Sequence, residues 1–142
     1  MAIQLSLRSG TLTAMLEGEI DHHTARELRE EIDSAASRTK PKRLILDFSK
    51  IRFMDSSGVG LILGRYRLVS QWGGELCVAN LSPNLERIVS LAGLKEICTV
   101  YRREENEQES KKHNMHNSIN FSNRNIRWSM LRLLQKTNIK NI

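Results

Sequence analysis

Two adjacent serines, Ser56 and Ser57, carry the clearest capacity for chemistry in this sequence. They follow Asp55 and precede Gly58 and Gly60, at a point where the spacing of apolar residues predicts the start of a helix. The N-terminus of a helix has free N–H groups and a partial positive charge, so it stabilises a nearby anion such as phosphate. A serine at this position also commonly caps the first turn. The motif therefore predicts either a serine that carries a phosphate or a serine that only caps the helix.

Three motifs of enzymes and nucleotide-binding proteins are incomplete in this sequence. A serine hydrolase elbow requires a glycine two residues before the serine, where Met54 stands. Gly58, Gly60 and Gly64 follow an expected strand, but the third glycine is one residue late for a dinucleotide fingerprint. The sequence has no G-x-x-x-x-G-K-[ST] run to hold phosphates. We therefore expect no catalytic activity, and a nucleotide-binding or hydrolytic α/β protein is the weaker alternative.

The histidines and cysteines do not have the spacing of a metal or redox site. His22 and His23 are adjacent, and we expect them in a polar loop before a helix, where their side chains point to opposite sides. Cys77 and Cys98 lie far apart in apolar runs, so we interpret them as small core residues with free thiols. The sequence predicts no cofactor and no metal site.

The net charge of +6 is unevenly distributed along the 142 residues. Residues 1–100 contain 13 Lys and Arg against 12 Asp and Glu, so this region is nearly neutral. The rest of the chain holds most of the excess charge and eight of the ten asparagines. We therefore predict one domain in residues 1–110 and a basic, Asn-rich C-terminal extension in residues 111–142.

The extension has several interpretations. A polar, Asn-rich terminus buries little apolar surface, which favours a poorly ordered segment. Residues 124–134 could instead form a short basic amphipathic helix, but they lack a groove-binding motif, so we expect no direct nucleic-acid partner. The abrupt change in composition also resembles translation past a frameshift, and we expect residues from about 112 onward to be dispensable. With neither a membrane span nor a secretion signal in the sequence, we expect a cytoplasmic protein.

The first forty residues predict a hairpin followed by a helix. Residues 3–7 and 12–16 alternate polar and apolar side chains on either side of a turn, as paired half-buried strands do. Thr24 and Glu27 fit a capping box, so the helix should begin there. Its apolar face should contain Leu28, Ile32, Ala35 and Ala36.

The next sixty residues alternate strands and helices. Residues 44–48 are a nearly continuous apolar run, which is typical of a central strand, and further strands are expected at residues 76–78 and 97–101. Helices should begin after Asp55 and at Pro83, which follows a capping serine. The inner face of the latter helix should hold Leu85, Ile88, Val89 and Ala92. The order β-β-α-β-α-β-α-β predicts an α/β fold with one mixed sheet and helices packed against it.

Three separated segments of this sequence resemble one protein family. Residues 47–66, which include the D-S-S-G-V-G run, closely resemble the phosphorylation-site region of STAS domains in bacterial anti-sigma factor antagonists. Residues 16–25 resemble the matching segment of the sporulation branch, whose members antagonise the anti-sigma F factor. Short motifs within residues 73–94 also fit, so the resemblance covers about residues 1–103.

The resemblance implies a STAS-like fold and a switch protein without catalytic activity. Such a protein, when unphosphorylated, binds an anti-sigma factor that is a serine kinase with its ATP or ADP, and this binding frees a sigma factor. The kinase inactivates the antagonist by phosphorylating one serine, and a serine phosphatase restores it. An antagonist of the general-stress type is the alternative, and the D-H-H-T run that begins at Asp21 favours the sporulation type.

The resemblance also assigns roles to individual residues. By position, the phosphate acceptor is Ser56, and its neighbour Ser57 is a capping or structural residue. Asp21 falls in the family segment that faces the partner and its nucleotide. The residues that bind the partner or support the phosphorylation site are then Asp21, Asp55, Ser57, Gly58 and Gly60.

Overall fold

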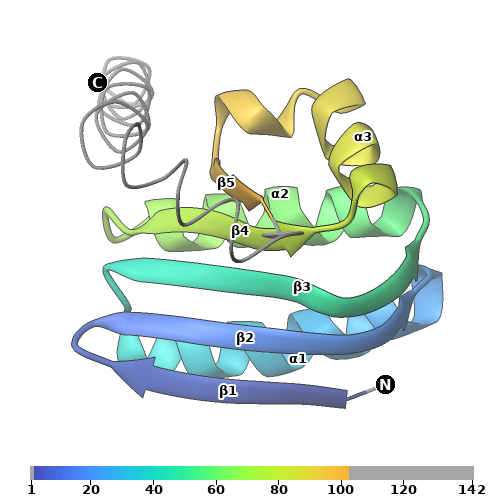
Figure 1. Cartoon of the computed structure of the whole chain (residues 1–142). Coiled ribbons are helices and arrows are strands. Elements are labelled where there is room, and N and C mark those ends of the chain that lie inside the picture. Colours follow the sequence, from blue (N-terminus) through green and yellow to red (C-terminus); the bar gives the residue numbers. More distant parts are fainter. Residues whose placement is uncertain (1, 103–142) are drawn as a thin grey trace, which may run out of the picture. The chain divides into compact units, whose positions relative to one another are not determined.

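The computed structural model describes residues 2–102 of the chain (Figure 1). The strands within these residues are β1 (Ala2–Arg8), β2 (Thr11–Ile20), β3 (Arg43–Met54), β4 (Glu75–Leu81) and β5 (Thr99–Arg102). The helices are α1 (His22–Thr39), α2 (Ser56–Ser70), α3 (Pro83–Leu91) and the short 3-10 helix η1 (Leu94–Glu96). This order confirms the predicted series of strands and helices. The expected boundary at residue 110 and the extension 111–142 lie outside the described residues.

The strands form one mixed sheet in the order β1-β2-β3-β4-β5. β1 and β2 are antiparallel, and all later neighbours are parallel. The hairpin turn needs two residues in the left-handed region, which Ser9 and Gly10 supply with φ values of 49° and 78°. β3 is the central strand, as its apolar run predicts, and the fold is the mixed α/β sheet expected from the sequence.

The core lies between the sheet and the two long helices. Figure 1 shows α1 and α2 on the same face of the sheet, behind the strands. The predicted inner residues of α1 are all buried there, together with alternate residues of β2 and β3. The largest fully buried side chains include Leu16, Ile20, Phe48 and Ile62. This packing places the N-terminal ends of α1 and α2 at one edge of the sheet.

The start of α1 and the end of β3 differ from the prediction. α1 begins at His22, because the N-cap is Asp21 and not Thr24. The two histidines therefore lie in the first turn of a helix and not in a loop. β3 continues to Met54, well beyond the apolar run at residues 44–48, because it goes on pairing with β2 through two register shifts. Ile51 and Met54 in this continuation are buried strand residues that the predicted strand does not include.

The C-terminal part of the described chain also corrects a detail. Ser82 caps α3 and Pro83 occupies its first turn, as predicted. Leu85 and Val89 are buried, but Ala92 is exposed, because α3 ends at Leu91. The buried residue that follows is Leu94, in η1.

Both cysteines are free and buried, which confirms their interpretation as core residues. Burial raises the pKa of the Cys77 thiol to about 11 and that of Cys98 to about 12, so both remain protonated and unreactive at neutral pH. Among the described residues no group of His, Cys, Asp and Glu has the arrangement of a metal site. In residues 2–102, no helix has the length and apolarity needed to cross a membrane.

Candidate functional site

The edge of the sheet where β2 and β3 end brings two aspartates together. Ile20 pairs with Met54 in the parallel register, and the backbone N–H of Asp55 donates to the carbonyl oxygen of Ile20 at 3.1 Å. The residue after each strand is an aspartate, Asp21 or Asp55, and each caps the helix that follows. Two segments that are distant in sequence therefore form adjacent helix starts.

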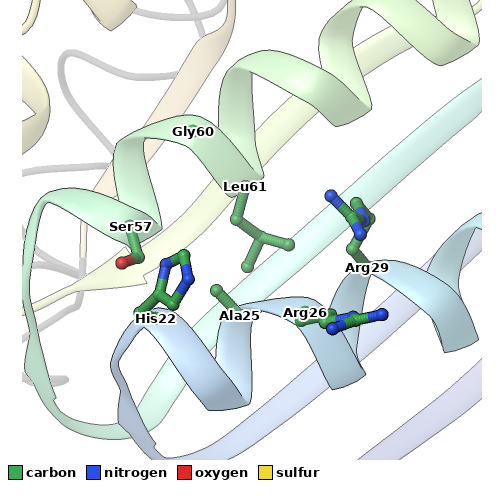
Figure 2. Close-up of a pocket in the computed structure, with 7 residues that line it drawn as sticks. All are labelled: His22, Ala25, Arg26, Arg29, Ser57, Gly60 and Leu61. Atoms are coloured by element: carbon green, nitrogen blue, oxygen red, sulfur yellow. The ribbon is translucent and has the colours of Figure 1, made fainter.

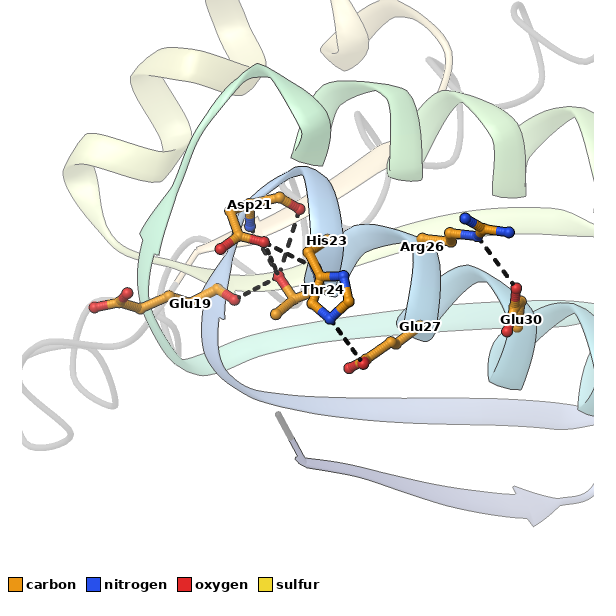
Figure 3. Close-up of polar contacts among 7 residues, drawn as sticks. All are labelled: Glu19, Asp21, His23, Thr24, Arg26, Glu27 and Glu30. Carbon is orange, nitrogen blue, oxygen red and sulfur yellow. Dashed lines mark hydrogen bonds and ion pairs between the residues drawn. The ribbon is translucent and has the colours of Figure 1, made fainter.

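The start of α1 is a closed capping box between Asp21 and Thr24 (Figure 3). The Thr24 N–H donates to Asp21 Oδ1 at 2.8 Å, and the Asp21 N–H donates to Thr24 Oγ1 at 2.8 Å. The Thr24 hydroxyl donates in turn to the carbonyl oxygen of Glu19 at 2.8 Å. The bond from the Thr24 N–H lowers the pKa of the Asp21 carboxyl, so this cap is ionised at neutral pH.

This geometry corrects the predicted capping box of Thr24 with Glu27. Thr24 is the N3 residue of the box rather than its N-cap, and Glu27 lies about one turn further along the helix. The Glu27 carboxylate instead approaches the His23 imidazole, with Nε2 and Oε1 at 3.4 Å. The residues predicted to form the capping box are therefore wrong, although the predicted helix is present.

The start of α2 is capped by Asp55 alone. The Ser57 N–H donates to Asp55 Oδ1 at 2.8 Å, and the Gly58 N–H donates to the Asp55 carbonyl oxygen at 3.0 Å. The Ser57 N–H is thus the donor to the cap, so of the two roles expected for Ser57, capping or structural, the capping role belongs to Asp55. The helix begins at Ser56, so both serines lie in its first turn.

The two serines differ in their surroundings. Ser56 is exposed, and its hydroxyl forms no hydrogen bond with any other described residue. Ser57 is half-buried and lines a groove between α1 and α2. Of the two hydroxyls, that of Ser56 is therefore the more accessible to another protein.

The two glycines of the motif also differ. A Cβ on Gly58 would lie 2.1 Å from the Sδ of Met54, which is itself buried, so the first turn of α2 packs tightly on the end of β3. A Cβ on Gly60 would meet no atom within 4 Å, and Gly60 lies on the exposed surface of the groove. A side chain at Gly58 would therefore force the buried Met54 side chain to move, whereas Gly60 leaves open space.

The groove between α1 and α2 has a volume of about 460 Å³ (Figure 2). Its described lining residues are His22, Ala25, Arg26, Arg29, Ser57, Gly60 and Leu61. The sequence alone gives no direct sign of this groove, because Arg26 and Arg29 have the spacing of residues on the solvated side of an amphipathic helix. Their spacing of three residues, which puts them on one side of α1 with His22, was the available signal.

An ion pair between the buried Arg65 on α2 and the half-buried Asp33 on α1 joins the two helices. Arg65 is only 5% exposed, and its Nε lies 2.7 Å from Oδ1 of Asp33. Burial raises the pKa of the Asp33 carboxyl, while the charges of Arg65 and Arg29 act in the opposite direction. Breaking this pair would leave the buried charge of Arg65 without a partner, which is costly. The pair therefore holds α1 and α2 together along the interface that also contains the groove.

The sequence as a whole matches a known family. The family model of the STAS domain matches residues 2–107. An anti-sigma F factor antagonist from Paenibacillus polymyxa is 39% identical over 106 residues, which cover 75% of this chain and 91% of the relative. An anti-sigma-B factor antagonist from Bacillus subtilis is 34% identical over 90 residues, which cover 63% of this chain and 81% of the relative.

Solved structures agree with this assignment. The anti-sigma factor antagonist SpoIIAA in its unphosphorylated form has 31% identity and a TM-score of 0.62, with 82% of this chain and 98% of that chain covered. The Bacillus SpoIIAA in its phosphorylated form has 32% identity and a TM-score of 0.58, with 79% and 98% covered. The chain therefore belongs to the STAS-domain family, in its branch of anti-sigma factor antagonists. This confirms the predicted family and a regulatory binding protein rather than an enzyme.

Proposed function

We propose that the unphosphorylated chain binds an anti-sigma factor that is a serine kinase, and so releases a sporulation sigma factor. The kinase then inactivates the chain by transferring phosphate from ATP to Ser56. The observation that carries this proposal is the exposed hydroxyl of Ser56 in the first turn of α2, which forms no hydrogen bond with another described residue. A relative of the same fold, SpoIIAA, has a structure in a phosphorylated form, which supports a phosphorylation site in this branch.

The helix start explains why phosphorylation would leave the domain folded. Phosphoserine adds about −1.5 to −2 charge and three acceptor oxygens at neutral pH. At the N-terminus of a helix this charge is stabilised by about 0.3–1 kcal/mol. Ser56 is exposed, so its phosphate needs no rearrangement of the core.

The same charge would weaken an interface that covers this edge. Asp55 directly precedes Ser56 and Asp21 caps the neighbouring helix, so two carboxylates already lie at this edge, and a bound partner excludes the water that hydrates them. An unpaired charge in an interface costs about 2–5 kcal/mol, which lowers affinity roughly thirty-fold to several thousand-fold. A binding switch thus follows from electrostatics without refolding.

The partners proposed for the cycle are the kinase with its ATP or ADP and a serine phosphatase that removes the phosphate in the cytoplasm. The sporulation assignment is supported by the D-H-H-T run at Asp21 and by the identity of 39% to an anti-sigma F factor antagonist. A general-stress antagonist is the second candidate, because an anti-sigma-B factor antagonist is 34% identical.

Phosphate transfer in vitro tests the acceptor. The full chain is incubated with the cognate kinase and ATP, and the modified residue is located by mass spectrometry. We expect one phosphate on Ser56, no uptake by Ser56→Ala, and normal uptake by Ser57→Ala. Phosphate on Ser57, or unchanged uptake by Ser56→Ala, would overturn the assignment.

A further inference from the structure

The groove between α1 and α2 opens beside the proposed phosphate acceptor. Ser57, the residue after Ser56, forms one end of it together with His22, while Arg26 and Arg29 lie toward the other end (Figure 2). A protein that binds over Ser56 therefore has this groove within reach.

The described lining of the groove is positively charged. It contains two arginines and no carboxylate. Arg26 pairs with Glu30 on the exposed surface of α1, with Nε and Oε1 at 3.6 Å. No carboxylate among the described residues lies within ion-pairing distance of the Arg29 guanidinium, although its charge acts on both Asp33 and Arg65. Arg29 is thus the cation of the groove that is available to a ligand.

We propose that this groove receives an acidic segment of the anti-sigma factor kinase, with a carboxylate on Arg29. This rests on the proposed function, since it extends the partner surface from the start of α2 onto α1. The volume of about 460 Å³ is larger than one carboxylate side chain and accommodates a short stretch of protein. Its apolar part, Leu61 and Ala25, packs against the aliphatic portion of such a segment.

The lining favours an acidic peptide over a nucleotide. A bound base stacks best on the aromatic rings of Phe, Tyr or Trp and needs hydrogen-bonding partners along its edge. The described lining has no Phe, Tyr or Trp, and its polar side chains are one serine, one histidine and the two arginines. Carboxylates match the arginines directly, because a guanidinium binds them through two parallel hydrogen bonds.

Charge reversal on α1 tests the proposal. The affinity of the full chain for the cognate kinase, loaded with ADP, is measured for Arg29→Glu and for Arg38→Glu, a matched reversal near the C-terminal end of the same helix. We expect Arg29→Glu to weaken binding about tenfold or more, and Arg38→Glu by less than about twofold. The difference should shrink at high salt, because salt screens exposed charges. Thermal melting confirms that both variants are folded.

A second pair of variants fills the groove from α2. A Cβ at Gly60 meets no atom within 4 Å, so Gly60→Glu and Gly60→Gln can start side chains of nearly equal size there. Both reduce the open volume, but only the glutamate repels an acidic segment. We expect Gly60→Glu to bind the kinase at least fivefold more weakly than Gly60→Gln, since like charges in an interface are strongly unfavourable.

The outcomes separate this inference from the proposed function. If the wild-type chain binds the kinase and accepts phosphate on Ser56, but Arg29→Glu binds equally well, the groove proposal is wrong and the function stands. Binding of ADP or ATP to the chain in the absence of the kinase, lost in Arg29→Glu, would reassign the groove to a nucleotide. A wild-type chain that does not bind the kinase overturns both.

Discussion

The two helix starts at the edge of the sheet have the same origin and different chemistry. Each follows a parallel strand and begins with an aspartate cap. At α1, the box closes on itself, so the Asp21 carboxylate and the Thr24 hydroxyl both have partners. At α2, Asp55 binds only backbone N–H groups and leaves the Ser56 hydroxyl exposed. The Thr24 hydroxyl is therefore held within the cap of α1, whereas the Ser56 hydroxyl at the start of α2 is accessible.

The largest effect should follow from a charge at Ser56. We expect Ser56→Glu to bind the kinase about ten-fold to a hundred-fold more weakly than wild type, because it adds a negative charge to the interface. The loss should be smaller than that caused by a phosphate, which carries more charge. Ser56→Gln is the uncharged control of similar size and should retain most of the binding. Isothermal titration calorimetry measures both. Equal losses for the two variants would point to size, and not charge, as the cause.

The two glycines of the α2 start should respond in opposite directions. Gly58→Ala forces the buried Met54 side chain to move, and overpacking of this kind costs about 1–3 kcal/mol. The gain in helix propensity offsets part of this, so we expect a net loss of about 1–2 kcal/mol in the free energy of unfolding. Gly60→Ala meets no atom and should gain about 0.5–1 kcal/mol. Urea denaturation measures the pair, and a stabilised Gly58→Ala would contradict the packing argument.

The smallest expected effects come from removing the Thr24 and Ser56 hydroxyls. Thr24→Ala opens the capping box and should lower the free energy of unfolding by about 1 kcal/mol, the usual contribution of such hydrogen bonds. Ser56→Ala removes an exposed hydroxyl and should change it by less than about 0.5 kcal/mol. Thermal melts of both variants test whether the α1 start is structural and the α2 start is not. Equal destabilisation would remove the distinction.

Much of the fold could be predicted because its signals are local. The alternation in β1 and β2, the apolar run at the start of β3 and the Ser82-Pro83 start of α3 each involve residues close together in sequence. The errors occur where a longer contact decides. Residues 49–54 alternate polar and apolar side chains over only four positions, from Lys50 to Phe53, and they are strand because β2 continues beside them. Thr24 has two local partners available, and the closure of the box by Asp21 selects one of them.

For the site, the sequence by itself determined the two-serine motif, the aspartates and the family, because these depend on residue types at short spacing. Only the tertiary structure decided which serine is exposed, since this depends on how α2 lies against its neighbours. It also decided that Gly58 has no room where Gly60 has, and that Arg29 faces the same groove as Ser57. These relations arise from the parallel register of β2 and β3 and from the packing of α1 on α2, which join residues that no local spacing connects.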